Sequence, residues 1–271
     1  MLTIVMALHC EASPLISKYK LKKVTEVHHY QYYQNNKINL VISGVGKAAS
    51  ASATGYSHAI NGSPPHTAWL NIGMAGHTDF DIGCGFLANK IHDRSTQQTW
   101  FPSIVFEPPC ITDKLLTVDR PDSKYQLNGG VDMEASGFYA TASRFTTNEL
   151  VQCYKVVSDN QRSPMKKIST KEATDLIQKK LDDINFLVEQ LLNARHALSA
   201  LYESPIMFDE ICDRIKLSHT EQLQVKDRLR KLYLLNPNAL TNKAILENQS
   251  SARKLLSTLD HIIARQEISF P

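Results

Sequence analysis

The sequence predicts an α/β fold, in which a central mixed sheet is flanked by helices, followed by an all-helical C-terminal extension. All 11 glycines lie between Gly44 and Gly137, and glycine marks turns and places where backbones approach closely. In that half, short apolar runs alternate with helix-forming segments, whereas the second half carries apolar residues at helical spacing. We therefore expect two domains, residues 1–200 and 201–271.

The first half contains short runs that are apolar or rich in β-branched residues, as expected of strands in a largely buried sheet. A helix rich in small residues is expected between the second and third strands, over residues 46–60. The predicted strands are LTIVMAL (2–8), KINLVISG (37–44), TAWLNIGMAG (67–76), GFLANKI (85–91), KLLTV (114–118) and CYKVVSD (153–159). Strands of this kind separated by helices favour a mostly parallel or mixed sheet.

The second half begins with a helix-start signal. Ser169 to Glu172 has the form of a capping box, and apolar residues follow at helical spacing, so we expect one long amphipathic helix from Ser169 to about Tyr202. Pro205 then interrupts the chain. Two further helices are expected over FDEICDRI and QLQVKDRLRKLY, with a second capping box at Ser218, and one or two more after Thr241.

Composition excludes several classes of protein. With 271 residues, 42% of them hydrophobic and 21% charged, the chain is typical of soluble globular proteins. No apolar run reaches membrane-spanning length, and the five scattered cysteines form no CxxC pair. We expect a cytoplasmic protein with reduced thiols, no metal and no cofactor. Up to residue 164 there are 14 basic and 13 acidic residues, and 16 and 14 after it, so neither half suits nucleic-acid binding.

Three acidic residues follow apolar strands: Glu11, Glu134 and Asp159. The carboxyl ends of parallel strands share one edge, so the three could converge on a ligand. Alternatively, each caps the helix that follows it. If VDMEA is a strand, Asp132 and Glu134 point to one face and Met133 to the other. Two carboxylates on one face suit a ligand rich in hydrogen-bond donors, such as a sugar.

Six motifs, MALHCEASPL, SGVGKAAS, LNIGMAG, IHD, VDMEAS and VVSDN, occur in the order and approximate spacing of the purine nucleoside phosphorylase and nucleosidase superfamily. The sequence most resembles the methylthioadenosine/adenosylhomocysteine nucleosidases, over about residues 1–195. The resemblance implies a three-layer nucleoside phosphorylase-like fold, a purine nucleoside substrate and a homodimer whose partner completes the pocket.

The resemblance also implies roles for particular residues. Glu11 matches the acid that activates the attacking water, and Asp159 matches the general acid that protonates N7 of the leaving purine. The matches on the substrate-binding side are Met133 and Glu134, which hold the ribose, Ser158, which precedes the general acid, and Ala75 and Gly76, which lie along the substrate. Asp132 could support the sugar site from behind or face solvent.

These residue types fit the cleavage of an N-glycosidic bond. Cleavage develops positive charge on the sugar and negative charge on the base, so a carboxylate near the sugar and a proton donor near the base both lower the barrier. Phosphate-dependent relatives need cationic groups for the anion, but LNIGMAG contains no arginine and Glu11 would repel phosphate. Water is therefore the expected nucleophile, with a phosphorylase as the second choice.

The sequence also departs from the family. Between Asp93 and Asp132 it is shorter by about a helix and a strand, and no aromatic residue there clearly matches the one that stacks on the base in the family; Tyr125 is the candidate. Met74 replaces a small polar residue, and Lys155 stands where the nucleosidases often have arginine. A nucleoside-binding or regulatory module with weak catalysis is the alternative function. The helical tail suits a protein partner better than a DNA-binding helix-turn-helix, because acidic residues match its basic ones.

Overall fold

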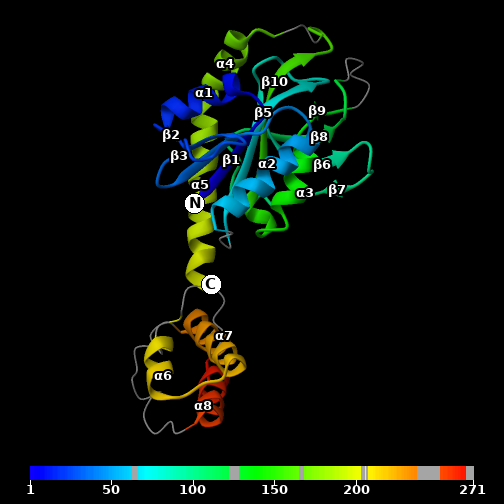
Figure 1. Ribbon diagram of the computed structural model, residues 1–271. Helices are drawn as coiled ribbons and strands as arrows, with labels where there is room; N and C mark the ends of the chain where they lie inside the picture. Colours follow the sequence, from blue (N-terminus) through cyan, green and yellow to red (C-terminus); the bar gives the residue numbers. More distant parts are fainter. Residues whose placement is uncertain are drawn as a thin grey trace. The chain divides into compact units, whose positions relative to one another are not determined.

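The computed structural model describes residues 1–62, 66–121, 128–164, 168–202, 205, 207–236 and 251–266, without the side chains of residues 200–202 (Figure 1). The chain divides into two compact units, Met1–His196 and Ala197–Pro271. Each unit is described by itself. None of the helices in these described residues is both long enough and apolar enough to cross a membrane.

The described residues of the first unit form a ten-stranded mixed sheet. The strands are β1 Leu2–Met6, β2 Lys22–Lys23, β3 Gln31–Gln34, β4 Ile38–Ile42, β5 Ala68–His77, β6 Gly85–Asp93, β7 Thr99–Trp100, β8 Ile111–Thr117, β9 Gly130–Asp132 and β10 Val151–Asn160. All six strands predicted from apolar runs are present. The unpredicted strands β2, β3 and β7 are short, and much of their surface is exposed, so their sequences lack the apolar run of a buried strand.

Strand β5 is the junction of the sheet. On one side it pairs in parallel with β1, which pairs in parallel with β4 and leads to the antiparallel edge strands β3 and β2. Further along that edge, Gly76 and His77 of β5 pair antiparallel with β9, while the opposite edge of β5 pairs in parallel with β10, so the order β5, β9, β8, β6, β10 returns to β5. Five strands therefore close into a small barrel, while the others extend from it as an open sheet.

Helices cover both sides of this sheet, as the predicted three-layer architecture requires. They are α1 His9–Lys18, α2 Lys47–Ile60, α3 Ala135–Ala142, α4 Thr170–Gln178 and α5 Leu181–Tyr202, with a 3₁₀ turn at Asn148–Leu150. Helix α1 packs on α4 and α2 packs on α3, and Figure 1 shows the two pairs on different sides of the strands. The buried cluster beneath α2 and α3 includes Trp69, Phe86, Phe138 and Tyr139.

The prediction of one long helix from Ser169 to Tyr202 is wrong, because the chain turns between α4 and α5. The Lys180 N–H donates to the carbonyl of Ile177, three residues back, and the next α-helical bond runs from Ile184 to Lys180. Ile177 and Leu181 are buried on either side of this turn, at the spacing of a continuous helix. The predicted capping box is present, since the Ser169 hydroxyl accepts from the Glu172 N–H.

The second unit contains three described helices, α6 Phe208–Arg214, α7 His219–Leu235 and α8 Ala252–Ala264. Helix α7 starts with the predicted capping box at Ser218 and packs on both other helices. They share one buried apolar cluster made of Phe208, Ile211, Ile215, Val225, Leu229, Leu232, Leu255 and Leu259. The first two predicted tail helices are confirmed; of the stretch after Thr241, residues 241–250 lie outside the described residues.

Two helical glycines test the contact between α2 and α3. A Cβ on Gly137 of α3 would lie 2.0 Å from the carbonyl oxygen of Lys47, whereas a Cβ on Gly55 of α2 would meet nothing closer than 4.0 Å. We expect Gly137→Ala to lower the free energy of unfolding in urea by about 2 kcal/mol or more, since the helices must separate. Gly55→Ala should raise it by about 0.5–1 kcal/mol, since alanine favours a helix. Equal effects would contradict this packing.

Candidate active site

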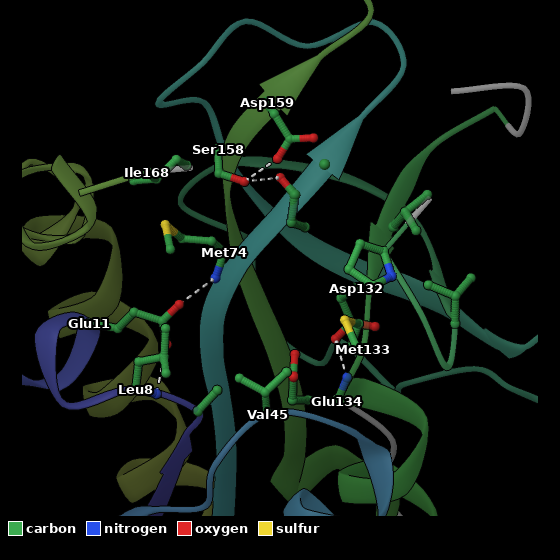
Figure 2. Close-up of a pocket in the computed structure, with 16 residues that line it drawn as sticks. Leu8, Glu11, Val45, Met74, Asp132, Met133, Glu134, Ser158, Asp159 and Ile168 are labelled. Atoms are coloured by element: carbon green, nitrogen blue, oxygen red, sulfur yellow. Dashed lines mark hydrogen bonds between the residues drawn. The ribbon is translucent and has the colours of Figure 1, made fainter. Parts of the chain in front are cut away.

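A pocket of about 330 Å³ lies at the carboxyl ends of β5, β9 and β10 (Figure 2). Strands β5 and β10 are parallel, so their ends share one edge, as the sequence predicts. The residues predicted for the site all line this pocket, although they come from distant segments: Glu11, Ala75, Gly76, Met133, Glu134, Ser158 and Asp159. The pocket therefore gathers the three carboxylates that the strand-end argument singles out.

Glu11 reaches the pocket from the first turn of α1 rather than from a strand end, because β1 ends at Met6. Its Oε2 accepts from the Leu8 N–H at 3.1 Å, which caps the helix, and its Oε1 accepts from the Met74 N–H of β5 at 3.3 Å. The capping alternative is thus partly right for Glu11. Burial raises the pKa of Glu11 to about 7, although nearby Lys155 opposes the shift.

Glu134 lies at the N-cap position of α3 and lines the pocket. Strand β9 ends at Asp132, so the strand alternation expected for VDMEA does not extend to Glu134. The capping is done by Asp132, whose Oδ2 accepts from the N–H groups of Glu134 and Ala135 at 3.2 and 2.8 Å. Glu134 Oε1 instead accepts from the N–H of Gly46 at 2.8 Å, and burial raises the pKa of Glu134.

Asp132 does not face solvent, which was one of its two expected placements. It forms an ion pair with the ammonium of Lys155 at 2.9 Å, and its other oxygen accepts from the Thr117 hydroxyl at 2.7 Å. Only 1% of the Lys155 side chain is exposed. Burial lowers the pKa of Lys155, but Asp132 and Glu134 outweigh it and raise that pKa. The pair supports the pocket from behind.

Gly73 marks the point where Lys155 and Glu11 approach the same strand. A Cβ at this position of β5 would lie 3.5 Å from the Lys155 ammonium and 3.9 Å from both Glu11 oxygens. These are ordinary van der Waals distances, so position 73 lies in direct contact with two buried groups of opposite charge and has no spare room beyond a Cβ. The sequence motif LNIGMAG contains this glycine, but nothing in the sequence indicates which groups meet there.

Ser158 and Asp159 stand at an irregularity of β10. Along the β5 pairing, Val157 faces Ala75 and Asp159 faces Gly76, so Ser158 is an extra residue, a β-bulge. The Ser158 Oγ lies 2.5 Å from Asp159 Oδ1 and 3.3 Å from the Ala75 carbonyl. Asp159 is buried and caps no helix, because α4 starts only at Thr170. The bulge turns this carboxylate toward the pocket.

Sequence reasoning missed most of the apolar lining. The pocket includes apolar residues that carry no chemistry of their own: Leu8, Val45, Val118, Pro121, Val131 and Ile168. Leu8 and Val45 lie inside motifs quoted for the resemblance, so that resemblance could have suggested them. Tyr125, predicted to meet the base, lies outside the described residues, and no described residue of the lining is aromatic. Across the described parts of the chain, no three His, Cys, Asp or Glu side chains form a metal site.

No protein-family model and no curated protein sequence matches the chain. Solved structures do resemble it. The 5′-methylthioadenosine nucleosidase of Arabidopsis thaliana, in apo form, is 19% identical with a TM-score of 0.57, over 68% of this chain and 94% of its own. The 5′-methylthioadenosine/S-adenosylhomocysteine nucleosidase of Colwellia psychrerythraea, in complex with adenine, is 17% identical with a TM-score of 0.55, over 70% and 93%.

A third neighbour, the futalosine hydrolase of Helicobacter pylori strain 26695, is 13% identical with a TM-score of 0.53, over 71% of this chain and 97% of its own. At these identities the likeness establishes the fold. The chain has the fold of the nucleoside phosphorylase and nucleosidase superfamily, and its structural neighbours include methylthioadenosine/adenosylhomocysteine nucleosidases, as the six motifs predict.

The raised pKa of Glu11 gives stability a defined pH dependence. Its pKa is about 7 in the folded protein against an ordinary 4.5, so folding favours the protonated form. That stabilisation is complete below pH 4.5 and is lost as pH rises through about 7. We expect Glu11→Gln to raise the free energy of unfolding by about 3 kcal/mol at pH 8 relative to its effect at pH 4.5. Urea titrations at both pH values measure this, and a pH-independent effect would contradict it.

The Lys155 and Asp132 pair should behave as a buried ion pair. We expect Lys155→Met to lower the free energy of unfolding by about 3–5 kcal/mol, because it leaves Asp132 without its cation. The double variant Lys155→Met, Asp132→Asn should be less destabilised than the sum of the two single variants. Urea unfolding of all four proteins measures the coupling, and strict additivity would show that the pair makes no mutual contribution.

Proposed function

We propose that this protein is a nucleosidase that hydrolyses the N-glycosidic bond of a purine nucleoside resembling methylthioadenosine or adenosylhomocysteine. The observation that carries the proposal is the meeting of Glu11, Glu134 and Asp159 in one pocket, on a fold shared with proteins described as nucleosidases of those compounds. Helix capping does not explain why the three carboxylates lie together, because the side chains of Glu134 and Asp159 cap no helix.

In the proposed mechanism Glu134 holds the ribose. One of its oxygens accepts from Gly46, which fixes the carboxylate and leaves the other oxygen for sugar hydroxyls. As the sugar becomes cationic, hydrogen bonds to this carboxylate strengthen, which stabilises the transition state more than the ground state. Met133, which also lines the pocket, packs against the sugar.

Glu11 and Asp159 complete the proposed mechanism. Glu11, with its pKa of about 7, accepts the proton of the attacking water near neutral pH, where a general base works best. Asp159 gives a proton to the departing purine, with Ser158 beside it at 2.5 Å orienting the carboxyl group. The water loses a proton at the sugar and the base gains one, so the products are free purine and free sugar.

Water is proposed as the nucleophile in place of phosphate. No lysine or arginine belongs to the described lining of the pocket, whereas Glu11, Asp132, Glu134 and Asp159 do. Lys155, a buried cation beside the pocket, is held by Asp132 at 2.9 Å. An incoming phosphate dianion would meet carboxylates without a positively charged partner, and this repulsion disfavours phosphorolysis.

The rim of the pocket suits an apolar substituent on the sugar. Leu8 and Val45 line the pocket and are 39% and 53% exposed, so both present apolar surface beside it. A methylthio or similar thioether group would cover them and remove apolar surface from water. A second subunit at this rim is the proposed alternative cover, in keeping with the expected homodimer. For the helical tail we propose a protein partner.

A second candidate is a nucleoside-binding module with weak catalysis. It is favoured by the lining on the Val118 and Pro121 side, where the described residues offer no aromatic ring to stack on a base. In that case the carboxylates would bind the sugar without turnover. Binding of a nucleoside without release of its base separates this candidate from the enzyme.

We expect the purified protein to release free purine from methylthioadenosine or adenosylhomocysteine at a rate unchanged by added phosphate. Glu134→Gln and Asp159→Asn should each lower kcat/KM by about 10²–10⁴-fold, because each removes a group that acts in the transition state. Base release is followed by absorbance or chromatography across a nucleoside panel. The enzyme proposal fails if no nucleoside is cleaved, or if both variants keep full activity.

The pH profile tests the role of Glu11 separately. Because Glu11 must be ionised to accept a proton and its pKa is about 7, the acid limb of the kcat/KM profile should rise through an apparent pKa near 7. Glu11→Gln should lower the maximum of the profile by at least about 10²-fold and abolish this acid limb. An unchanged limb in Glu11→Gln would assign the ionisation to another group.

A further inference from the structure

Two motif residues that the proposed mechanism does not use, Lys47 of SGVGK and Asp93 of IHD, meet beside Glu134. Asp93 ends β6 and is 3% exposed. Both of its oxygens accept from the Lys47 ammonium at 3.1 Å. One oxygen also accepts from the Ser136 hydroxyl at 2.6 Å, and the other from the N–H groups of Ser95 and Thr96 at 2.9 Å.

Two partners of Asp93, Lys47 and Ser136, lie in the first turns of the two helices next to Glu134. Lys47 is the first residue of α2 and directly follows Gly46, whose N–H holds Glu134 Oε1. Ser136 is the second residue of α3, which starts immediately after Glu134. One buried carboxylate therefore links the segment that carries Glu134 to the segment that binds its side chain.

The backbone at this junction is tightly constrained. Gly46 has a φ of +103°, a conformation that other residues rarely adopt. Gly137 of α3 approaches the Lys47 carbonyl so closely that no Cβ fits between them. These contacts fix the distance between α2 and α3. The ion pair of Lys47 with Asp93 additionally ties the start of α2 to the end of β6.

The ionised form of Asp93 is strongly stabilised by its partners. Although burial raises it, hydrogen bonds from Ser136, Thr96 and Lys47 hold the pKa of Asp93 well below its usual range. Lys47 also pairs with Asp119 at 2.9 Å, and 24% of its side chain is exposed. Lys47 thus connects a buried anion to the surface, at the start of the helix whose N-cap amide contacts Glu134.

We propose that Lys47 and Asp93 are positioning residues that hold the Gly46 N–H against Glu134 and so orient the carboxylate toward the sugar, a role that rests on the proposed function. Removing the ammonium leaves the buried Asp93 uncompensated and lets the first turn of α2 shift. A shift of a fraction of an ångström at Gly46 rotates Glu134 away from the geometry that its transition-state hydrogen bonds need.

The kinetic test compares Lys47→Met and Lys47→Arg in wild-type and Glu134→Gln backgrounds. Lys47→Met should lower kcat about 10–100-fold with a smaller change in KM, and Lys47→Arg should recover at least half of the loss on a logarithmic scale. In the Glu134→Gln background Lys47→Met should cost less than about 2-fold, because the group it orients is already impaired. Equal fold losses in both backgrounds would overturn the proposal.

Lys180→Met is the matched control. Lys180 is similarly exposed, at 28%, and also forms an ion pair with an aspartate, Asp183 at 3.7 Å, but among the described residues it is not part of the pocket lining. It should leave kcat and KM within about 2-fold of the wild type. A loss comparable to that of Lys47→Met would indicate a general effect of removing a lysine.

A measurement without turnover separates this inference from the proposed function. Val45–Gly46 is the one Val–Gly pair in the sequence, so labelling valine carbonyls with ¹³C and glycine amides with ¹⁵N gives a single NMR signal for Gly46. Lys47→Met should speed hydrogen exchange of this amide at least about 10-fold, whereas Lys180→Met should not. If Lys47→Met speeds exchange but the wild-type protein cleaves no nucleoside, only the proposed nucleosidase activity is refuted. Unchanged exchange would refute the positioning role, whatever the activity.

Discussion

The pocket depends on the electrostatic interaction of the buried Lys155 ammonium with the carboxylates around it. Three buried carboxylates, those of Glu11, Asp132 and Glu134, lie within its influence, and without a cation their burial on neighbouring segments would be prohibitively costly. Lys155 pairs directly with Asp132, so it compensates the other two only in part, and their pKa values stay raised. The pocket is therefore lined by more hydrogen-bond acceptors than donors, and a ligand rich in donors can bind to these carboxylates.

The fold supplies the geometry for this arrangement. Because β5 pairs with β1, β9 and β10, the open sheet and the small barrel share one strand, and the segments that follow these strands converge at its carboxyl end. Small residues occupy that end of β5: Gly73 lies against Lys155 and Glu11, and Ala75 and Gly76 line the pocket. The charged groups come from the helices and strands around β5, while β5 itself contributes backbone and space.

The sequence predicts the three-layer fold and the set of carboxylates well, because apolar runs and motif order are local signals. It fails where distant contacts decide. Ile177 and Leu181 keep helical spacing across the turn that separates α4 from α5, and the two lysines in that turn favour a helix, so no local signal marks the break. Asp132, rather than Glu134, caps α3 because Lys155 and Thr117 fix it there. The apolar lining at Val118 and Pro121 carries no sequence signal, and the roles of Glu11, Glu134 and Asp159 stay predictions.

The bulge at Ser158 makes chain length as important as side-chain identity in this part of the protein. Alternate residues of a strand face opposite sides, so the single extra residue decides which side Asp159 faces. A substitution at position 158 leaves that count intact, whereas removal of one residue would move the carboxylate to the opposite face of the strand. A change of length between Val157 and Asp159 would therefore redirect the carboxylate, whereas a substitution at Ser158 would alter only its immediate hydrogen bonding.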